Sequence, residues 1–172
     1  MKLFIKQEVF SGWEHFYVKD ENGQDVYEIR APRKAVRVGL QLNIFDMEGR
    51  DLAYIDQKAF SFQPLFRVHK NGEQVATIAK KFTMLKPRYE VKELGWTIQG
   101  DFTAHAYTVT DQRGNIVMAI RKALISWGDS FELDIRDTAH VLEAMAVVLA
   151  IDCVVDSEGD GISVNGFSFG KN

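Results

Sequence analysis

The sequence predicts a mainly β protein: a closed antiparallel barrel of about twelve strands that encloses one hydrophobic helix near the C-terminus. Three observations predict this fold. From residue 3 to about 135, apolar residues recur with period two, the spacing of strands that bury one face. Turn signals separate these runs at hairpin spacing, with no linker between them. From Thr138 to Val155 the pattern changes to helix-forming residues without Gly or Pro.

The predicted strands are short alternating runs, and tight turns divide them. Asn22-Gly23 and Asn71-Gly72 are the strongest turn signals, because both residue types tolerate the positive φ of a two-residue hairpin. Gly49, Gly95 and Gly114 end three further turns. So many strands in one small domain favour closure, which removes exposed edges, and a two-sheet sandwich is the alternative. The clearest alternating runs are 26–31, 36–44, 66–68, 75–77, 89–91, 107–109, 116–120 and 131–135.

Length and composition fit one folded domain that spans residues 1–172. Hydrophobic residues make up 46% of the chain and charged residues 26%, which is typical of globular proteins. The formal charge of -3 does not favour nucleic acid as a partner. The one cysteine, Cys153, excludes an intrachain disulfide, and the first ten residues lack the apolar stretch of a signal peptide. We therefore expect a cytoplasmic protein, with peripheral attachment to a membrane as a further option.

The helix predicted at about 138–155 is apolar on nearly every face. Such a helix crosses a membrane, covers a partner, or lies inside its own fold. Its longest charge-free run is 144–151, between Glu143 and Asp152, whereas a membrane span needs about 20 apolar residues. At 1.5 Å per residue the helix is about 26 Å long, close to the height of a barrel. We expect it to thread the barrel, with Glu143 and Asp152 near the ends, where the barrel opens to water.

With this architecture the chain resembles the LURP-one-related family, which has the tubby-like C-terminal fold, and more distantly the phospholipid scramblases. The segments that carry the resemblance are 4–7, 89–91, 96–102, 131–135 and 146–152. They are packing and turn patterns, and they cover almost the whole chain. The resemblance implies a family without an assigned enzymatic reaction, whose structural relatives, the tubby proteins and scramblases, act at membranes.

Two local runs of basic residues are the best candidate site in this acidic chain. Arg supplies bidentate donors and Lys a point charge, so the two runs predict a site for an anionic headgroup such as a phosphoinositide. The tubby phosphoinositide motif has no complete match here. The alternative is that these residues lie on solvated outer faces of strands. The candidate ligand-binding residues are Arg30, Arg33, Lys34 and Arg37 in the first run, and Lys80, Lys81, Lys86 and Arg88 in the second.

Motifs for metals and catalysis are missing or incomplete. Segment 127–134 stands where scramblases carry an acidic segment proposed to bind calcium, but it is thin in oxygen ligands. Segment 156–161 begins like an EF-hand loop but has Phe167 at the twelfth position, so we interpret both segments as polar loops. The four histidines lack metal-ligand spacing, and Cys153 lies among apolar helix residues. We predict no metal, no cofactor and no catalytic residue.

The sequence therefore favours a non-enzymatic binding or scaffold domain, with an anionic lipid or a phosphorylated small molecule as the candidate ligand. One alternative is an enzyme whose site assembles across strands, which a close His and carboxylate pair in a polar pocket would favour. Another is a protein-interaction scaffold that uses an exposed edge or residues 167–169.

Overall fold

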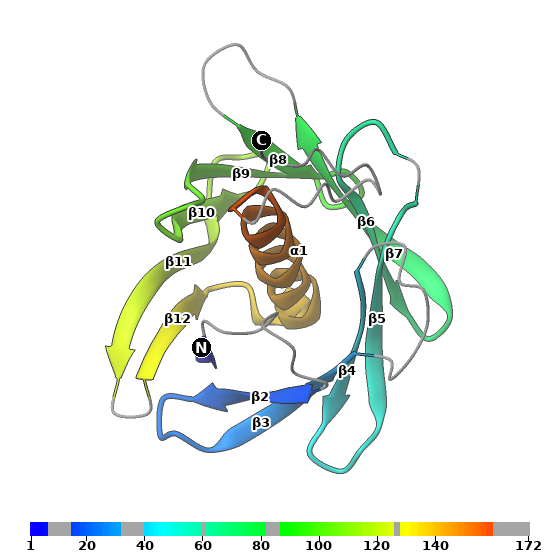
Figure 1. Cartoon of the computed structure of the whole chain (residues 1–172). Helices are drawn as coiled ribbons and strands as arrows, with labels where there is room; N and C mark the ends of the chain where they lie inside the picture. The colour runs from blue at the N-terminus through cyan, green and yellow to red at the C-terminus, as the bar shows by residue number, and fades with distance from the viewer. Residues whose placement is uncertain (7–14, 32–39, 60, 82–86, 126–127, 160–172) are drawn as a thin grey trace, which may run out of the picture.

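The computed structural model describes residues 1–6, 15–31, 40–59, 61–81, 87–125 and 128–159, and in them twelve strands surround one helix (Figure 1). The strands are β1 (Lys2–Lys6), β2 (His15–Asp20), β3 (Asp25–Arg30), β4 (Gln41–Asp46), β5 (Asp51–Gln57), β6 (Leu65–Lys70), β7 (Glu73–Lys81), β8 (Arg88–Val91), β9 (Trp96–Asp101), β10 (Ala106–Thr110), β11 (Ile116–Ile125) and β12 (Gly128–Ile135). Of the predicted run 36–44, residues 36–39 lie outside the described part.

The sheet closes on itself. Each strand pairs antiparallel with its neighbours in the chain, and β1 completes the ring by pairing with β12, with Lys2 opposite Asp134, as well as with β2. The predicted closed barrel is confirmed, and the sandwich alternative is wrong. Inward side chains alternate with outward ones along each strand. On β4, for example, Leu42 and Ile44 both point inward and are buried, so the period-two pattern marks the inner wall.

The helix begins three residues later than predicted and ends later as well. A single 3-10 turn, η1 (Thr138–His140), precedes α1 (Val141–Gly159). The Asp137 carboxylate accepts a hydrogen bond from the Ala139 amide at 3.2 Å and caps this first turn. The tighter turn moves the start of the α-helix to Val141.

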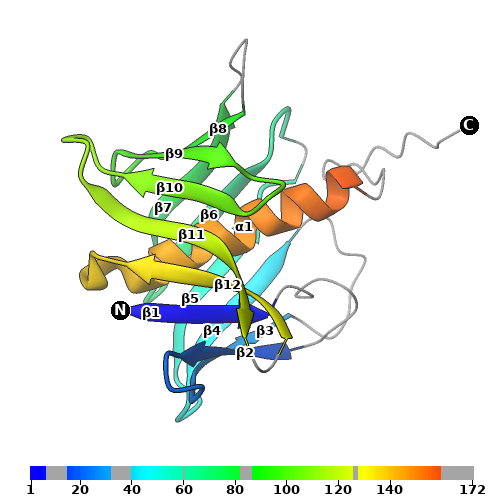
Figure 2. The ribbon, with the colours of Figure 1, turned by 90° about the vertical axis from the view of Figure 1, so that its left-hand side faces the viewer.

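The helix fills the barrel (Figures 1 and 2). Every residue from 144 to 151 is buried, and its side chains form one hydrophobic cluster with the inner wall. Ala144, Ala146 and Ala150 alternate with larger residues, which lets strands approach closely on several sides. By length and composition alone Thr138–Val155 would suffice to cross a membrane, yet 61% of this segment is buried. The predicted barrel around a hydrophobic helix is confirmed.

The two ends of the barrel differ. Tight turns at 20–25, 46–51, 70–73, 91–96 and 110–116 close one end, here called the hairpin end, where the helix also begins. The Asn71-Gly72 turn has φ of 52° and 81°, the left-handed values its sequence predicts. The opposite end, here called the loop end, holds the remaining connections, and the helix runs toward it (Figure 2).

Candidate functional site

Two acidic residues of the helix are held inside the barrel, one toward each end. Near the hairpin end the Lys70 ammonium lies 3.0 Å from a Glu143 oxygen, and near the loop end His105 Nε2 lies 2.9 Å from Asp152 Oδ1. Glu143 is 4% exposed and Asp152 is 2% exposed. The two charges lie toward the ends of the barrel, as expected, but they are buried, and a basic partner from the wall meets each of them.

The loop-end pair belongs to a buried polar cluster. The His105 ring stacks on Phe131 with centroids 4.1 Å apart. In this cluster His105 Nδ1, Asp152 Oδ2 and the Tyr107 hydroxyl have no hydrogen-bond partner among the described residues. Burial raises the pKa of Asp152, which the hydrogen bond from His105 offsets only in part, and burial raises the pKa of Tyr107 well above its ordinary value. A His and carboxylate pair exists here, but it is enclosed by the core.

Half of the predicted basic residues can be placed. Arg33, Lys34, Arg37 and Lys86 lie outside the described residues. Arg30, at the end of β3, donates to the Glu28 carboxylate at 2.6 Å and stacks over the Phe45 ring at 4.2 Å. Three strands, β4 to β6, lie between β3 and β7, and the four interstrand spacings make a path of roughly 19 Å around the wall. Arg30 and the placed residues of the second run therefore share an end of the barrel without forming one site.

Two described residues of the second run, Lys81 and Arg88, form a basic pair at the loop end. Lys81 on β7 is directly opposite Arg88 on β8, so two like charges meet across the strands. Glu90 lies 2.8 Å from Lys81, while Arg88 forms no ion pair with any described residue. Lys80 stands opposite Tyr89, whose side chain is buried, so Lys80 faces the mouth of the barrel. Like charges in direct opposition are unfavourable unless something compensates them.

Charge is divided between the two ends of the barrel. In the turns of the hairpin end, acidic residues outnumber the basic Arg50, Lys70, Lys92, Arg113 and Arg136. At the loop end, the described strand ends and connections carry the acidic Asp101 and the basic Lys6, Arg30, Lys58, Lys81 and Arg88, and the end of the helix adds the acidic Asp156 and Glu158. The acidic residues of the hairpin end are Asp20, Glu21, Asp25, Asp46, Glu48, Asp51, Glu73, Glu93, Asp111 and Asp137.

An exposed aromatic residue lies beside the basic pair. Phe62, in the connection from β5 to β6, is 93% exposed, the highest value among the large hydrophobic residues described. The same connection carries Lys58, and its Pro64 carbonyl accepts a hydrogen bond from the Lys80 amide at 3.2 Å, which ties it to the end of β7. We call Lys58, Phe62, Lys81 and Arg88 the basic-aromatic rim.

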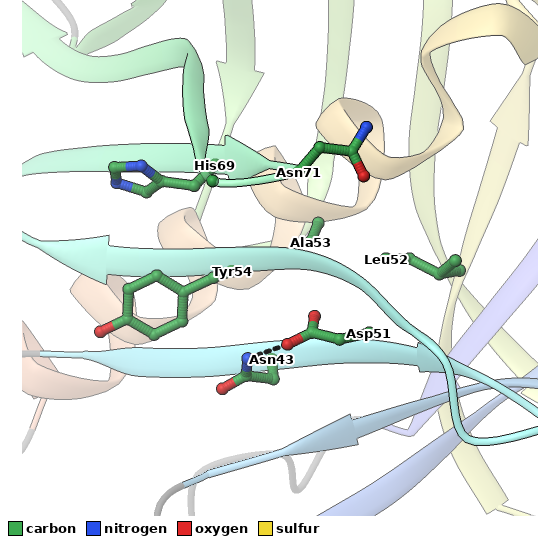
Figure 3. A pocket seen from close by; sticks show the side chains of 8 residues that line it. Asn43, Asp51, Leu52, Ala53, Tyr54, His69 and Asn71 are labelled. Carbon is green, nitrogen blue, oxygen red and sulfur yellow. Dashed lines mark hydrogen bonds between the residues drawn. The ribbon is translucent and has the colours of Figure 1, made fainter.

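A separate depression lies on the outer wall of β4, β5 and β6 (Figure 3). Its volume is ≈ 500 Å³, and its lining includes Asn43, Asp51, Tyr54, His69 and Asn71. Beside it the buried Asp56 carboxylate lies 3.0 Å from His69 Nε2 and accepts a hydrogen bond from Arg67 Nε at 3.1 Å. Sequence reasoning missed this group, because its members come from different strands and share no motif.

The candidate metal segments gain no support. Within the described part of the chain, no group of three or more His, Cys, Asp or Glu side chains is placed to hold a metal ion. The interpretation of segments 127–134 and 156–161 as polar loops is wrong for their described parts, because residues 128–134 belong to β12 and residues 156–159 to α1. Residues 127 and 160–161 lie outside the described part. Cys153 packs against the hydrophobic core, as its place in the helix predicts.

Comparison with known proteins agrees with this architecture. The family model described as LURP-one-related matches residues 1–152. The uncharacterized protein YxjI of Bacillus subtilis (strain 168) is 31% identical over 160 residues, which cover 93% of this chain and 97% of that protein. An X-ray structure of a protein from Arabidopsis thaliana matches with a TM-score of 0.59 at 12% identity, covering 88% of this chain and 90% of the other. At that identity the structural match shows the fold alone.

Proposed function

The chain belongs to the LURP-one-related family, and from this premise we propose that it is a non-enzymatic binding domain that holds an anionic, phosphorylated ligand at the loop end of its barrel. The observation that carries the proposal is the cross-strand pair of Lys81 and Arg88, with Arg88 lacking a described acidic partner. A phosphate group accepts from both Arg and Lys, so it would relieve the repulsion between them.

The distribution of charge supports a defined orientation. A negatively charged surface attracts the basic loop end and repels the acidic hairpin end, so the barrel would approach such a surface along its axis. Phe62 favours a lipid bilayer over a free phosphate as the source of the anion, because an aromatic ring settles readily at the headgroup level. The domain would then be a cytoplasmic protein that docks peripherally, with its helix kept inside the barrel.

The enzyme alternative has one observation in its favour, the Asp56 and His69 pair beside an open depression. A carboxylate that orients an imidazole is part of many catalytic sites. However, the described lining of that depression holds no Ser, Thr or Cys to act as a nucleophile. Binding without catalysis is therefore the better supported function.

Co-sedimentation with liposomes tests the proposal. The full chain should bind vesicles that contain phosphoinositide, and binding should weaken as salt rises. Each basic residue near such a surface contributes about 1 kcal/mol, so the double variant Lys58→Glu and Arg88→Glu should bind at least about tenfold more weakly. Arg113→Glu, a charge reversal in a hairpin-end turn, is the matched control and should bind like the wild type.

Two further variants separate the possible sources of the anion. Phe62→Ser should weaken binding to vesicles but leave the affinity for a soluble inositol phosphate unchanged if the ligand is a lipid surface. Equal effects on both would point to a free phosphorylated molecule. Reversal of Arg33, Lys34 and Arg37 tests the first basic run. If the wild type binds neither vesicles nor inositol phosphate at low salt, the proposal is wrong.

A further inference from the structure

We propose that the outer-wall depression on β4, β5 and β6 is a second binding site, independent of the loop end, and that it takes a neutral polyhydroxylated ring such as a hexose. The depression is open to solvent and faces away from the core, so a ligand can enter it without disturbing the barrel (Figure 3). Its lining combines one aromatic ring with amide, carboxylate and imidazole groups, a mixture typical of sites that bind small polar ligands.

The register of three strands places the central side chains in one row. Tyr54 on β5 is directly opposite Asn43 on β4 and also directly opposite His69 on β6. Residues paired in this way project from the same face of a sheet. Two interstrand spacings make the row about 10 Å long, which suits a single sugar ring with its substituents.

Two bulges shape the sheet around this row. Between Ile44 and Phe45 the pairing with β5 shifts, so that Leu52 is an extra residue and Asp51 pairs with Phe45. The shift brings the Asp51 carboxylate to the Asn43 amide, which donates a hydrogen bond at 2.9 Å. A second shift, between Val68 and His69, leaves Val75 as an extra residue on β7. Bulges of this kind re-aim side chains and are frequent beside functional sites.

A hydrogen bond to the neighbouring Asp56 orients the ring of His69. An ionised carboxylate only accepts, so His69 Nε2 carries the proton that bonds to Asp56 Oδ1 at 3.0 Å. In the neutral imidazole Nδ1 is then an acceptor. Arg67 bonds to the other Asp56 oxygen, and Asp56 is 6% exposed. Asp56 is therefore a positioning residue, which sets the tautomer and the orientation of the imidazole.

The remaining groups define the ligand. The second Asp51 oxygen and the Asn43 carbonyl are acceptors, and His69 Nδ1 accepts in the neutral form of the ring, so this group fits a ligand that presents several hydroxyl donors. The Tyr54 ring, 5.8 Å from the His69 ring between centroids, gives an apolar surface for the C–H face of a sugar. A phosphorylated ligand fits poorly, because Asp51 is negative and the Arg67 guanidinium is engaged by Asp56. The loop end thus favours an anionic ligand, whereas the outer-wall depression favours a neutral one.

The test is a titration of the full chain with methyl glycosides of glucose, galactose, mannose and N-acetylglucosamine, followed by amide chemical shifts in solution NMR. At least one glycoside at millimolar concentration should shift the resonances of β4, β5 and the Asn71-Gly72 turn. Tyr54→Ala should weaken this binding at least tenfold, and Asp51→Ala should weaken it several-fold. Glu73→Gln, at an exposed position near the same turn, is the control and should leave it unchanged.

The inference is overturned if no glycoside shifts these resonances, or if the shifts survive Tyr54→Ala. A phosphorylated sugar that binds the depression more tightly than its neutral parent would also contradict it. Because the variants lie on the outer wall, their thermal unfolding should match that of the wild type, and their binding of anionic vesicles should be unchanged.

Discussion

Both the hairpin end and the loop end of the barrel hold a buried acidic residue of the helix, but they do so with different basic partners. Each end holds the helix through a buried acidic residue, Glu143 near the hairpin end and Asp152 near the loop end. The partner of Glu143 is Lys70, whose side chain is 29% exposed, whereas the partner of Asp152 is His105, whose side chain is 7% exposed. The Lys70 side chain of the hairpin-end pair is therefore partly open to water, whereas both side chains of the loop-end pair are buried.

The two ends also differ in how their connections form and in what they carry on the surface. The hairpin end consists of short turns with a negative balance of charge, and each turn follows from local sequence. The loop end carries the basic-aromatic rim on its outside and the least satisfied polar cluster of the core beneath it. A charged group buried without full hydrogen bonding reduces stability. The end that we propose to bind the ligand is therefore also the end where the fold is held less firmly.

The largest expected effect comes from breaking the helix that joins the two ends. Leu149 is 1% exposed, and Leu149→Asp would bury a carboxylate without a partner, at a cost comparable to the whole free energy of unfolding of a typical domain. We expect the variant to be unfolded by circular dichroism. Met47→Asp, at a position 47% exposed in a hairpin-end turn, should remain folded. A folded Leu149→Asp protein would show that the helix is not required inside the barrel.

A smaller effect should distinguish two glycines with positive φ, one near each end. At Gly100, φ is 146°, and a Cβ atom would lie 2.4 Å from the Ala106 carbonyl oxygen, so backbone would have to move. At Gly49, φ is 82°, and a Cβ atom would meet nothing within 4 Å. Gly100→Ala should destabilise the fold by about 3 kcal/mol and Gly49→Ala by about 1 kcal/mol, measured by chemical denaturation. Equal losses would mean that the close approach of β9 and β10 is not a constraint.

The smallest effect is a difference in pH dependence between the ends. The pKa of Asp152 is raised by burial, so the native state binds more protons than the unfolded state above pH 3.8, and this group reduces stability as pH rises. The hydrogen bonds from Arg50 hold the pKa of Asp46 below 3.8 despite some desolvation, so Asp46 contributes stability that is lost as pH falls. Relative to the wild type, Asp152→Asn should gain stability from pH 3.8 toward neutrality, whereas Asp46→Asn should lose it. Slopes of the same sign would refute this assignment.

Much of the fold could be predicted from the sequence because its causes are local. Alternation marked the inner wall, Asn71-Gly72 marked a turn, and the charge-free run 144–151 distinguished a buried helix from a membrane span. The start of the helix was predicted three residues too early, because the sequence does not distinguish a first 3-10 turn from α-helix.

The sites were less predictable because their members meet only through register. Lys70 and Glu143 are 73 residues apart, and His105 and Asp152 are 47 apart. Asp56 reaches His69 only because of the register in which β5 and β6 pair, and a shift of this register by one residue would move one of the two side chains to the other face of the sheet. The bulge at Leu52 is likewise not visible in the alternating pattern of the sequence. The second basic run was found from composition, but its cross-strand opposition of Lys81 and Arg88 required the structure.

The central claim, that the loop end binds and the hairpin end does not, is tested most directly by hydrogen exchange of the full chain with and without anionic vesicles. The account predicts slower exchange of amides in residues 57–65 and 79–90 when vesicles are present. It predicts unchanged exchange in the turns at 46–51 and 110–116. Protection of the hairpin-end turns, or bound protein with no protection at the loop end, would contradict it.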